Sequence, residues 1–66
     1  MAITNEDMIE LEEDMGLRTV EAKRRYHKLQ INILNELYEI VKGEDVKLLL
    51  VEEILAHQKR LVKLLG

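Results

Sequence analysis

The sequence predicts an all-α protein, in which a short N-terminal helix precedes a long antiparallel helical hairpin that dimerises into a four-helix bundle. Three observations predict this class. The chain has no proline and only three glycines in 66 residues, so long stretches lack helix breakers. Apolar residues recur at helical spacing over two long segments. The apolar sides of both segments are too wide to be covered by one another alone.

The first helix is predicted over residues 4–15. Thr4 stands at the N-cap and Asp7 follows three residues later, which is a capping box with Asp in the place of Glu. Gly16 follows the helix, where it can adopt the left-handed conformation that ends many helices.

The two long helices are predicted over residues 19–43 and 45–65. Thr19 and Asp45 are the expected N-caps, and Gly43 lies in the short break between the two helices. Such a short connection makes two helices antiparallel neighbours. All three helices belong to one domain that spans residues 1–66.

Self-association is the strongest inference from the sequence. Each long helix has an apolar side about 200° wide, whereas a surface helix needs only about 100°. A chain of this size usually needs an additional source of stability, and the absence of cysteine excludes disulfides. We therefore expect a homodimer or a higher closed oligomer with no cofactor. Its predicted interface comprises Tyr26, Ile33, Leu34, Leu37, Val41, Leu50, Ile54 and Leu61.

Four polar residues interrupt these apolar sides. They are His27 and Gln30 in the second helix, and His57 and Gln58 in the third. In a hairpin that turns near residues 43–45, residues at one level have numbers adding to about 87 or 88, so the four should form one polar core layer. We expect the layer to set the register and the number of partners, as a buried Asn does in coiled coils. A partly hydrated layer with no special role is an alternative.

A carboxylate–histidine metal site is a further alternative for this layer. Glu53 and His57 are four residues apart and so share one side of a helix. Di-iron bundles, however, use Glu and His three residues apart. The four-residue spacing does not match this signature. We therefore predict no metal site, and these two residues are only weak metal candidates.

Charge divides the chain into regions of opposite sign. The first 17 residues contain six carboxylates and no basic residue, and the net charge is −3. Basic residues gather where the predicted hairpin opens and form a possible contact surface. They are Arg18, Lys23, Arg24, Arg25, Lys28, Lys59, Arg60 and Lys63.

The segment 5–28 resembles a helix-turn-helix motif, with Gly16 at the turn and a basic start to the second helix. This resemblance implies a small dimeric DNA-binding regulator. The acidic first helix would be repelled by phosphates, and Glu12 stands where such motifs prefer a small residue. Nucleic acid is therefore a less favoured partner than protein.

The expected function is non-catalytic. We expect a regulatory or adaptor module that binds itself and another protein. No nucleophile motif or phosphate-binding loop is present, so no enzyme is predicted. The longest apolar run is residues 48–51, far too short for a membrane span, and no signal peptide is visible. These observations favour a cytoplasmic protein.

Overall fold

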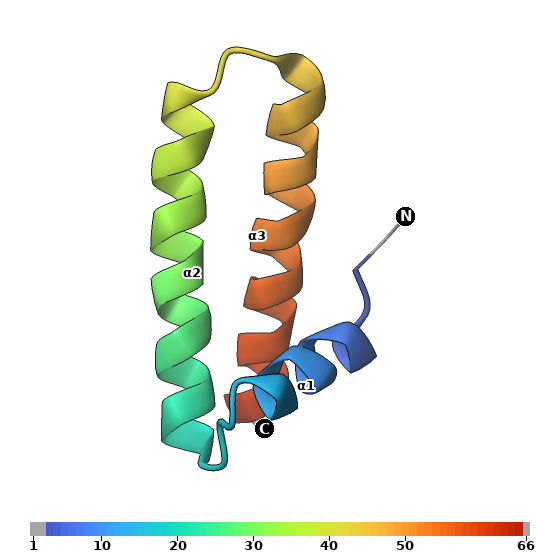
Figure 1. Cartoon of the computed structure of the whole chain (residues 1–66), viewed down its shortest axis with the longest axis vertical. Coiled ribbons are helices and arrows are strands. Elements are labelled where there is room, and N and C mark those ends of the chain that lie inside the picture. Colours follow the sequence, from blue (N-terminus) through green and yellow to red (C-terminus); the bar gives the residue numbers. More distant parts are fainter. Residues whose placement is uncertain (1–2, 66) are drawn as a thin grey trace.

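A computed structural model of the chain describes residues 3–65, and the regular secondary structure within that range is entirely helical. The helices are α1 (Asn5–Asp14), α2 (Val20–Ile40) and α3 (Glu44–Leu65), so the predicted all-α class is confirmed. α2 and α3 lie side by side in opposite directions, and α1 crosses the end where α2 begins and α3 ends (Figure 1). We call this end the open end, and the end at residues 41–43 the turn end.

Both ends of α1 are closed by local hydrogen bonds, as predicted. The Thr4 hydroxyl accepts from the Asp7 amide at 3.2 Å, and the Asp7 carboxylate accepts from the Thr4 amide at 2.9 Å. After the helix, Gly16 has a φ of 73°. The amides of Gly16 and Leu17 donate to the carbonyls of Glu13 and Glu12, which is a Schellman motif. The capping box and the motif together set the length of α1.

The turn between α2 and α3 differs from the prediction. Thr19 caps α2 as expected, because its hydroxyl accepts from the Ala22 amide at 3.1 Å. α2 ends at Ile40, however, and α3 begins at Glu44, so Asp45 lies inside α3 and is not its N-cap. Packed helix axes are about 8–10 Å apart, and three extended residues span about 10 Å. α2 therefore ends early because the chain needs this length to reach α3.

The shifted turn changes which residues face one another. The chain reverses midway between Ile40 and Glu44, so residues at one level have numbers adding to about 84 and not 87 or 88. His27 is then level with His57, whereas Gln30 is level with Ile54. In this register Gln30 is not level with His57, which is where the sequence-based register placed it.

Few apolar side chains are fully covered within one chain. Among residues 3–65, the buried apolar residues are Met8, Leu34 and Ala56. The short side chain of Ala56 allows neighbouring residues to pack closely against it, and Ala56 lies in the half of α3 nearer the open end.

No helix in the described range is long and apolar enough to cross a membrane.

Candidate functional site

The open end contains a buried polar cluster made of Glu12, His27, His57 and Arg60, with one contribution from α1, one from α2 and two from α3. Glu12 and His27 are 0% exposed and His57 is 5% exposed. Buried ionisable groups are rare unless they are paired. The cluster is therefore the most unusual chemical feature of the described chain.

α1 places Glu12 in this cluster through its helical spacing. Asn5, Met8 and Glu12 are separated by three and four residues, so they lie on one side of the helix. That side faces the hairpin, since Met8 and Glu12 are the two buried residues of α1. Met8 thus anchors the helix and Glu12 enters the cluster one turn later.

Arg60 binds the Glu12 carboxylate through two parallel hydrogen bonds. Its Nε donates to Oε2 at 2.7 Å, and its Nη2 donates to Oε1 at 2.8 Å. Nη1 donates to the Asn5 side-chain oxygen at 3.3 Å. This paired geometry is among the strongest that two charged side chains can form. It joins α1 to α3.

His27 joins the same carboxylate to α2. Its Nε2 lies 2.6 Å from Glu12 Oε2. Glu12 already accepts two hydrogen bonds from a guanidinium, so it is ionised and can only accept. His27 Nε2 must therefore carry a proton and donate it to Glu12.

The two histidines face one another through their Nδ1 atoms. These atoms are 2.7 Å apart, and the ring centroids are 4.9 Å apart. Ring bonds of about 1.33 Å place each nitrogen about 1.1 Å from its centroid. The centroid separation is thus near the maximum for this contact, so the nitrogens point straight at each other. One hydrogen bond with a single proton joins the rings.

Tyr26 and Lys23 complete the surroundings of the cluster on α2. The Tyr26 ring meets the rings of His27 and His57 edge-on, with centroids at 5.2 and 6.2 Å. Burial raises the pKa of Tyr26. The Lys23 ammonium lies 3.9 Å from Glu12 Oε1. One carboxylate is thus surrounded by two permanent cations and a histidine.

These contacts move the pKa values of three groups in the cluster. Hydrogen bonds from Arg60 are the main reason that the pKa of Glu12 is lowered, and burial opposes them. Burial lowers the pKa of His57, and the neighbouring His27 adds to that effect. The same Glu12 contact raises the pKa of Arg60. Glu12 is therefore held as an anion and His57 as a neutral ring.

The polar layer expected from the sequence is only partly assembled. The structure brings His27 and His57 into contact, while Gln30 is half-buried and Gln58 is exposed. Gln58 directly follows His57 and so points about 100° away from it. A member of the cluster that was not expected, Glu12, takes the place of the glutamines.

Glu12 had a signal in the sequence that was not used. It lies four residues after Met8 and one after Leu11, so it interrupts the apolar side of α1 as the histidines interrupt those of α2 and α3. A search for polar residues inside apolar helix sides would have found it. Its partners Arg60 and Lys23 were predicted only as possible contact residues.

The predicted interface residues occupy different environments within one chain. Leu34 is buried between the long helices and so belongs to the core of the hairpin. Ile33 and Leu37 are exposed. The others are half-buried, namely Tyr26, Val41, Leu50, Ile54 and Leu61.

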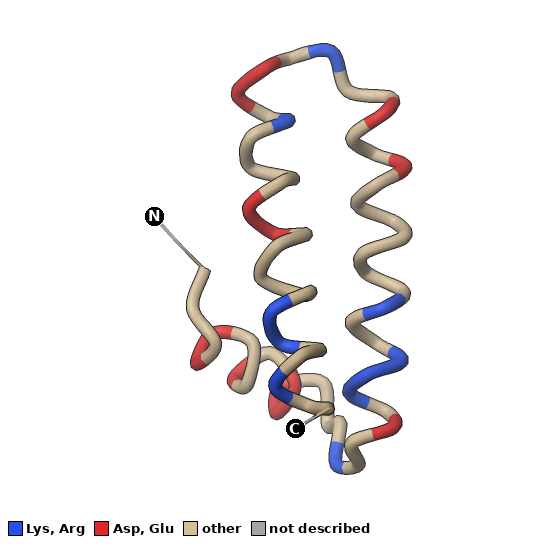
Figure 2. The backbone as a smooth tube through the Cα atoms, turned by 180° about the vertical axis from the view of Figure 1, so that it is seen from behind, with Lys and Arg blue, Asp and Glu red and all other residues tan. Residues whose placement is uncertain are grey.

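Basic residues gather on α2 and α3 near α1, while acidic residues other than Glu21 lie on α1 and toward the turn end (Figure 2). Lys42 and Lys47 are exceptions at the turn end.

α1 packs mainly on α3, whereas a helix-turn-helix requires its first helix to support the second. Lys23 and Arg60 also face the Glu12 carboxylate. The remaining predicted basic residues are exposed or half-buried, namely Arg18, Arg24, Arg25, Lys28, Lys59 and Lys63.

The two metal candidates, Glu53 and His57, differ in their exposure. Glu53 is exposed and His57 is buried, so the two side chains occupy different environments. In the part of the chain that the structure describes, no group of three or more His, Asp or Glu side chains is arranged to hold a metal ion. The head-on geometry of the histidines suits a shared proton.

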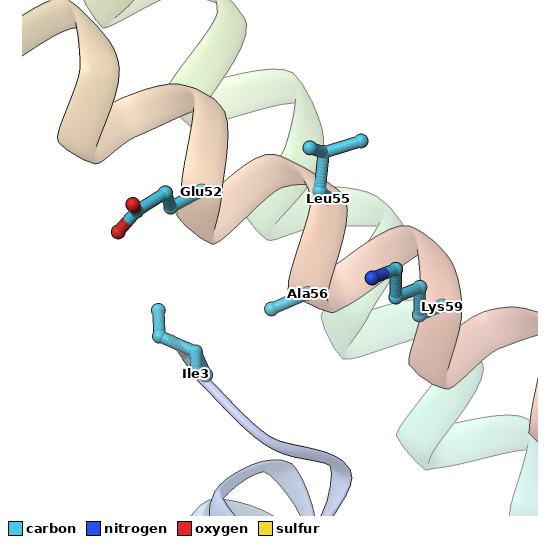
Figure 3. A pocket seen from close by; sticks show the side chains of 5 residues that line it. All are labelled: Ile3, Glu52, Leu55, Ala56 and Lys59. Atoms are coloured by element: carbon cyan, nitrogen blue, oxygen red, sulfur yellow. The ribbon is translucent and has the colours of Figure 1, made fainter. Parts of the chain in front are cut away.

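A small cavity lies beside the cluster, between the segment before α1 and the outer side of α3. It has a volume of about 120 Å³ and is lined by Ile3, Glu52, Leu55, Ala56 and Lys59. The Ile3 side chain points toward α3 near Ala56 (Figure 3).

Comparisons of the chain with protein-family models, curated proteins and solved structures find no match.

Proposed function

We propose that the chain is a non-catalytic, homo-oligomeric helical bundle that acts as a regulatory or adaptor module through protein–protein contacts. The observation that carries this proposal is an exposed apolar stripe along α3. Leu48, Val51, Leu55 and Val62 are spaced by three, four and seven residues, so they share one side of the helix. Their exposed fractions range from 37% to 68%. Apolar surface of this extent marks an interaction site in a folded protein.

The stripe continues across the hairpin into a shallow groove. Tyr38 and Asn35 of α2 line the groove with Val51, Ile54 and Leu55 of α3, and its volume is about 200 Å³. A groove of this lining offers a place for apolar side chains from a partner. Side chains of this size stabilise by about 1.5–3 kcal/mol each when fully buried.

A second copy of the chain fits the stripe because its spacing is symmetric. Leu48 and Val62 each lie seven residues from Leu55. An antiparallel copy of α3 therefore places Leu55 opposite itself and Leu48 opposite Val62. A two-fold contact of this kind uses the same surface on both chains. Two hairpins joined in this way form a four-helix bundle.

Charges beside the stripe favour the same antiparallel orientation. Asp45, Glu52 and Lys59 are spaced by seven residues and Lys63 follows four later, so the four share one side of α3. In the antiparallel pair, Glu52 approaches Lys59 of the second copy, and Asp45 approaches Lys63. Exposed pairs add only about 0–1 kcal/mol each, but they select the orientation of a contact.

The adaptor role rests on α2, which the contact through α3 leaves uncovered. Leu29, Ile33, Leu37 and Ile40 are all exposed and recur at helical spacing. Two such stripes, one on each chain, would bind a second protein.

The environment of the two histidines supports a non-catalytic role. Both rings are buried, and three of their four nitrogens contact protein groups, namely both nitrogens of His27 and Nδ1 of His57.

The test uses single cysteines, since the chain has none of its own. Leu55→Cys should form a disulfide-linked dimer under mild oxidation, because the two-fold axis brings residue 55 of both chains together. Leu48→Cys is the matched control, as the two copies of residue 48 would be about 21 Å apart. A mixture of Leu48→Cys and Val62→Cys chains should crosslink.

Sedimentation of the unmodified chain at micromolar concentration should show a dimer or a higher closed oligomer. A folded monomer would overturn the proposal. Crosslinking of Leu48→Cys as well as Leu55→Cys, without crosslinking between Leu48→Cys and Val62→Cys chains, would show a parallel contact and contradict the antiparallel arrangement.

A further inference from the structure

The histidine pair limits how many protons the open end can hold. A head-on contact of 2.7 Å between two Nδ1 atoms requires one proton between them, since two N–H groups cannot point at each other. His27 Nε2 carries a second proton, which it donates to Glu12. Only Nε2 of His57 is left to take a third. While the contact lasts, the two rings hold at most one positive charge.

Charged groups on all three helices surround the histidine pair. α1 contributes Glu12, α2 contributes Lys23 beside Tyr26, and α3 contributes Arg60. The single carboxylate already faces two cations. A second positive charge on the rings would place more positive charge in a buried space than Glu12 can balance.

Glu12 is also what attaches α1 to both long helices. It contacts His27 of α2 and Arg60 of α3, and Met8 is the only other residue of α1 that is buried. Loss of the Glu12 contacts therefore leaves α1 with one buried side chain, Met8, and one hydrogen bond between Asn5 and Arg60. α1 is the element whose attachment depends most on the state of the cluster.

We propose that the His27–His57 pair is a proton-operated latch that holds α1 on the open end of the hairpin and releases it when both rings become protonated. With α1 detached, Glu12 no longer fixes the His27 ring, so the two Nδ1 atoms can turn away from each other. The two rings can then hold four protons on their four nitrogens, one more than the head-on contact allows. Free histidines are protonated below about pH 6.5. In that range, a state that binds one extra proton gains up to tenfold in population for each unit by which the pH falls. Release exposes Ala56 and leaves Lys23 and Arg60 without their carboxylate.

The test follows α1 in the full chain by NMR between pH 8 and pH 5. The amide signals of residues 5–14 should move from an attached to a detached state as the pH falls below about 6.5. Signals of residues 35–50 should change little, because they lie toward the turn end, away from the cluster. Signals from α1 that stay unchanged down to pH 5 would overturn the proposal.

A histidine variant shows whether the pair causes the change. Asn at position 57 keeps a donor near the position of Nδ1 but takes up no proton. His57→Asn should therefore hold α1 at every pH in the range, and Glu13→Gln, at an exposed neighbour of Glu12, should behave as the parent chain does. Release of α1 from His57→Asn at the parent's pH midpoint would contradict the latch.

The ring nitrogens provide a second measurement if His57→Asn fails to attach α1. At pH 8, the ¹⁵N signals of the parent chain should show a proton on Nε2 of His27 and one proton shared by the Nδ1 atoms. Two rings that each take up a proton while α1 stays attached would refute the proposal. This outcome is independent of self-association through α3.

Discussion

The two ends of the hairpin are held together by different chemistry. At the open end, a buried carboxylate and two buried histidines are paired within one chain, with one another and with a half-buried guanidinium. At the turn end, Ile40 and Val46 are exposed, and the Lys47 ammonium lies 5.2 Å from the centroid of the Tyr38 ring. Directional hydrogen bonds complete the open end, whereas the turn end leaves apolar surface for another molecule.

This difference shows where one chain is sufficient and where it is not. Hydrogen bonds require specific partners at specific distances, and each of the four side chains in the cluster has one. Apolar burial has no direction and increases with area, and a hairpin of two helices offers little area. Replacing one member of the cluster should therefore cost more than shortening an apolar side chain elsewhere.

The largest effect is expected from Glu12→Leu. This change leaves Arg60 and Lys23 without their carboxylate and His27 without an acceptor. Removing one partner of a buried ion pair costs about 3–5 kcal/mol. Urea unfolding followed by circular dichroism measures the loss. Glu13→Leu is the control at an exposed site and should change stability by about 0.5 kcal/mol or less. Equal losses in both variants would contradict the importance of the cluster.

The next largest effect is expected from Leu34→Ala, at the buried apolar contact between α2 and α3. Leu34 is 7% exposed, and truncating a buried leucine costs about 2–5 kcal/mol. Leu37→Ala, one turn further on at a site 42% exposed, should cost less than about 1 kcal/mol. Thermal unfolding of both variants provides the measurement. A larger loss for Leu37→Ala would mean that a second chain covers this side of α2.

Acid should weaken the open end in two stages. The lowered pKa of His57 means that its contribution is complete above about pH 6.5 and is lost as the pH falls through the folded-state pKa. The lowered pKa of Glu12 means that its contribution is complete above about pH 4.3 and is lost below that. The free energy of unfolding, measured in urea from pH 8 to pH 3, should therefore decrease in two steps. A free energy that rises between pH 7 and pH 5 would contradict the assigned direction for His57.

The smallest effect is expected from Gly16→Ala, at the C-terminus of α1. Nothing lies within 4 Å of the added carbon, so the cost arises only from the φ of 73°. An L-residue in this conformation costs about 1 kcal/mol. Urea unfolding measures it, with Gly43→Ala as the control at a glycine without positive φ. Equal costs at the two glycines would argue against strain at Gly16.

The helical class and the capping residues of α1 and α2 followed directly from the sequence, whereas the N-cap predicted at Asp45 did not. Thr4, Asp7, Gly16 and Thr19 act as predicted because capping depends on residues within one helical turn. The presence of polar residues inside the apolar sides of α2 and α3 was also visible, since helical spacing alone reveals it. These are local properties, and a sequence read in order contains them.

The partners inside the cluster were decided by the tertiary structure. The turn at residues 41–43 moved the register by about two residues on each helix, which paired His27 with His57 and left Gln30 and Gln58 outside. The position of α1 across the open end brought Glu12 to Arg60, from 48 residues away in the chain. Sequence order does not determine which side of a hairpin a short helix covers, because that choice depends on the packing of side chains that are distant in the chain.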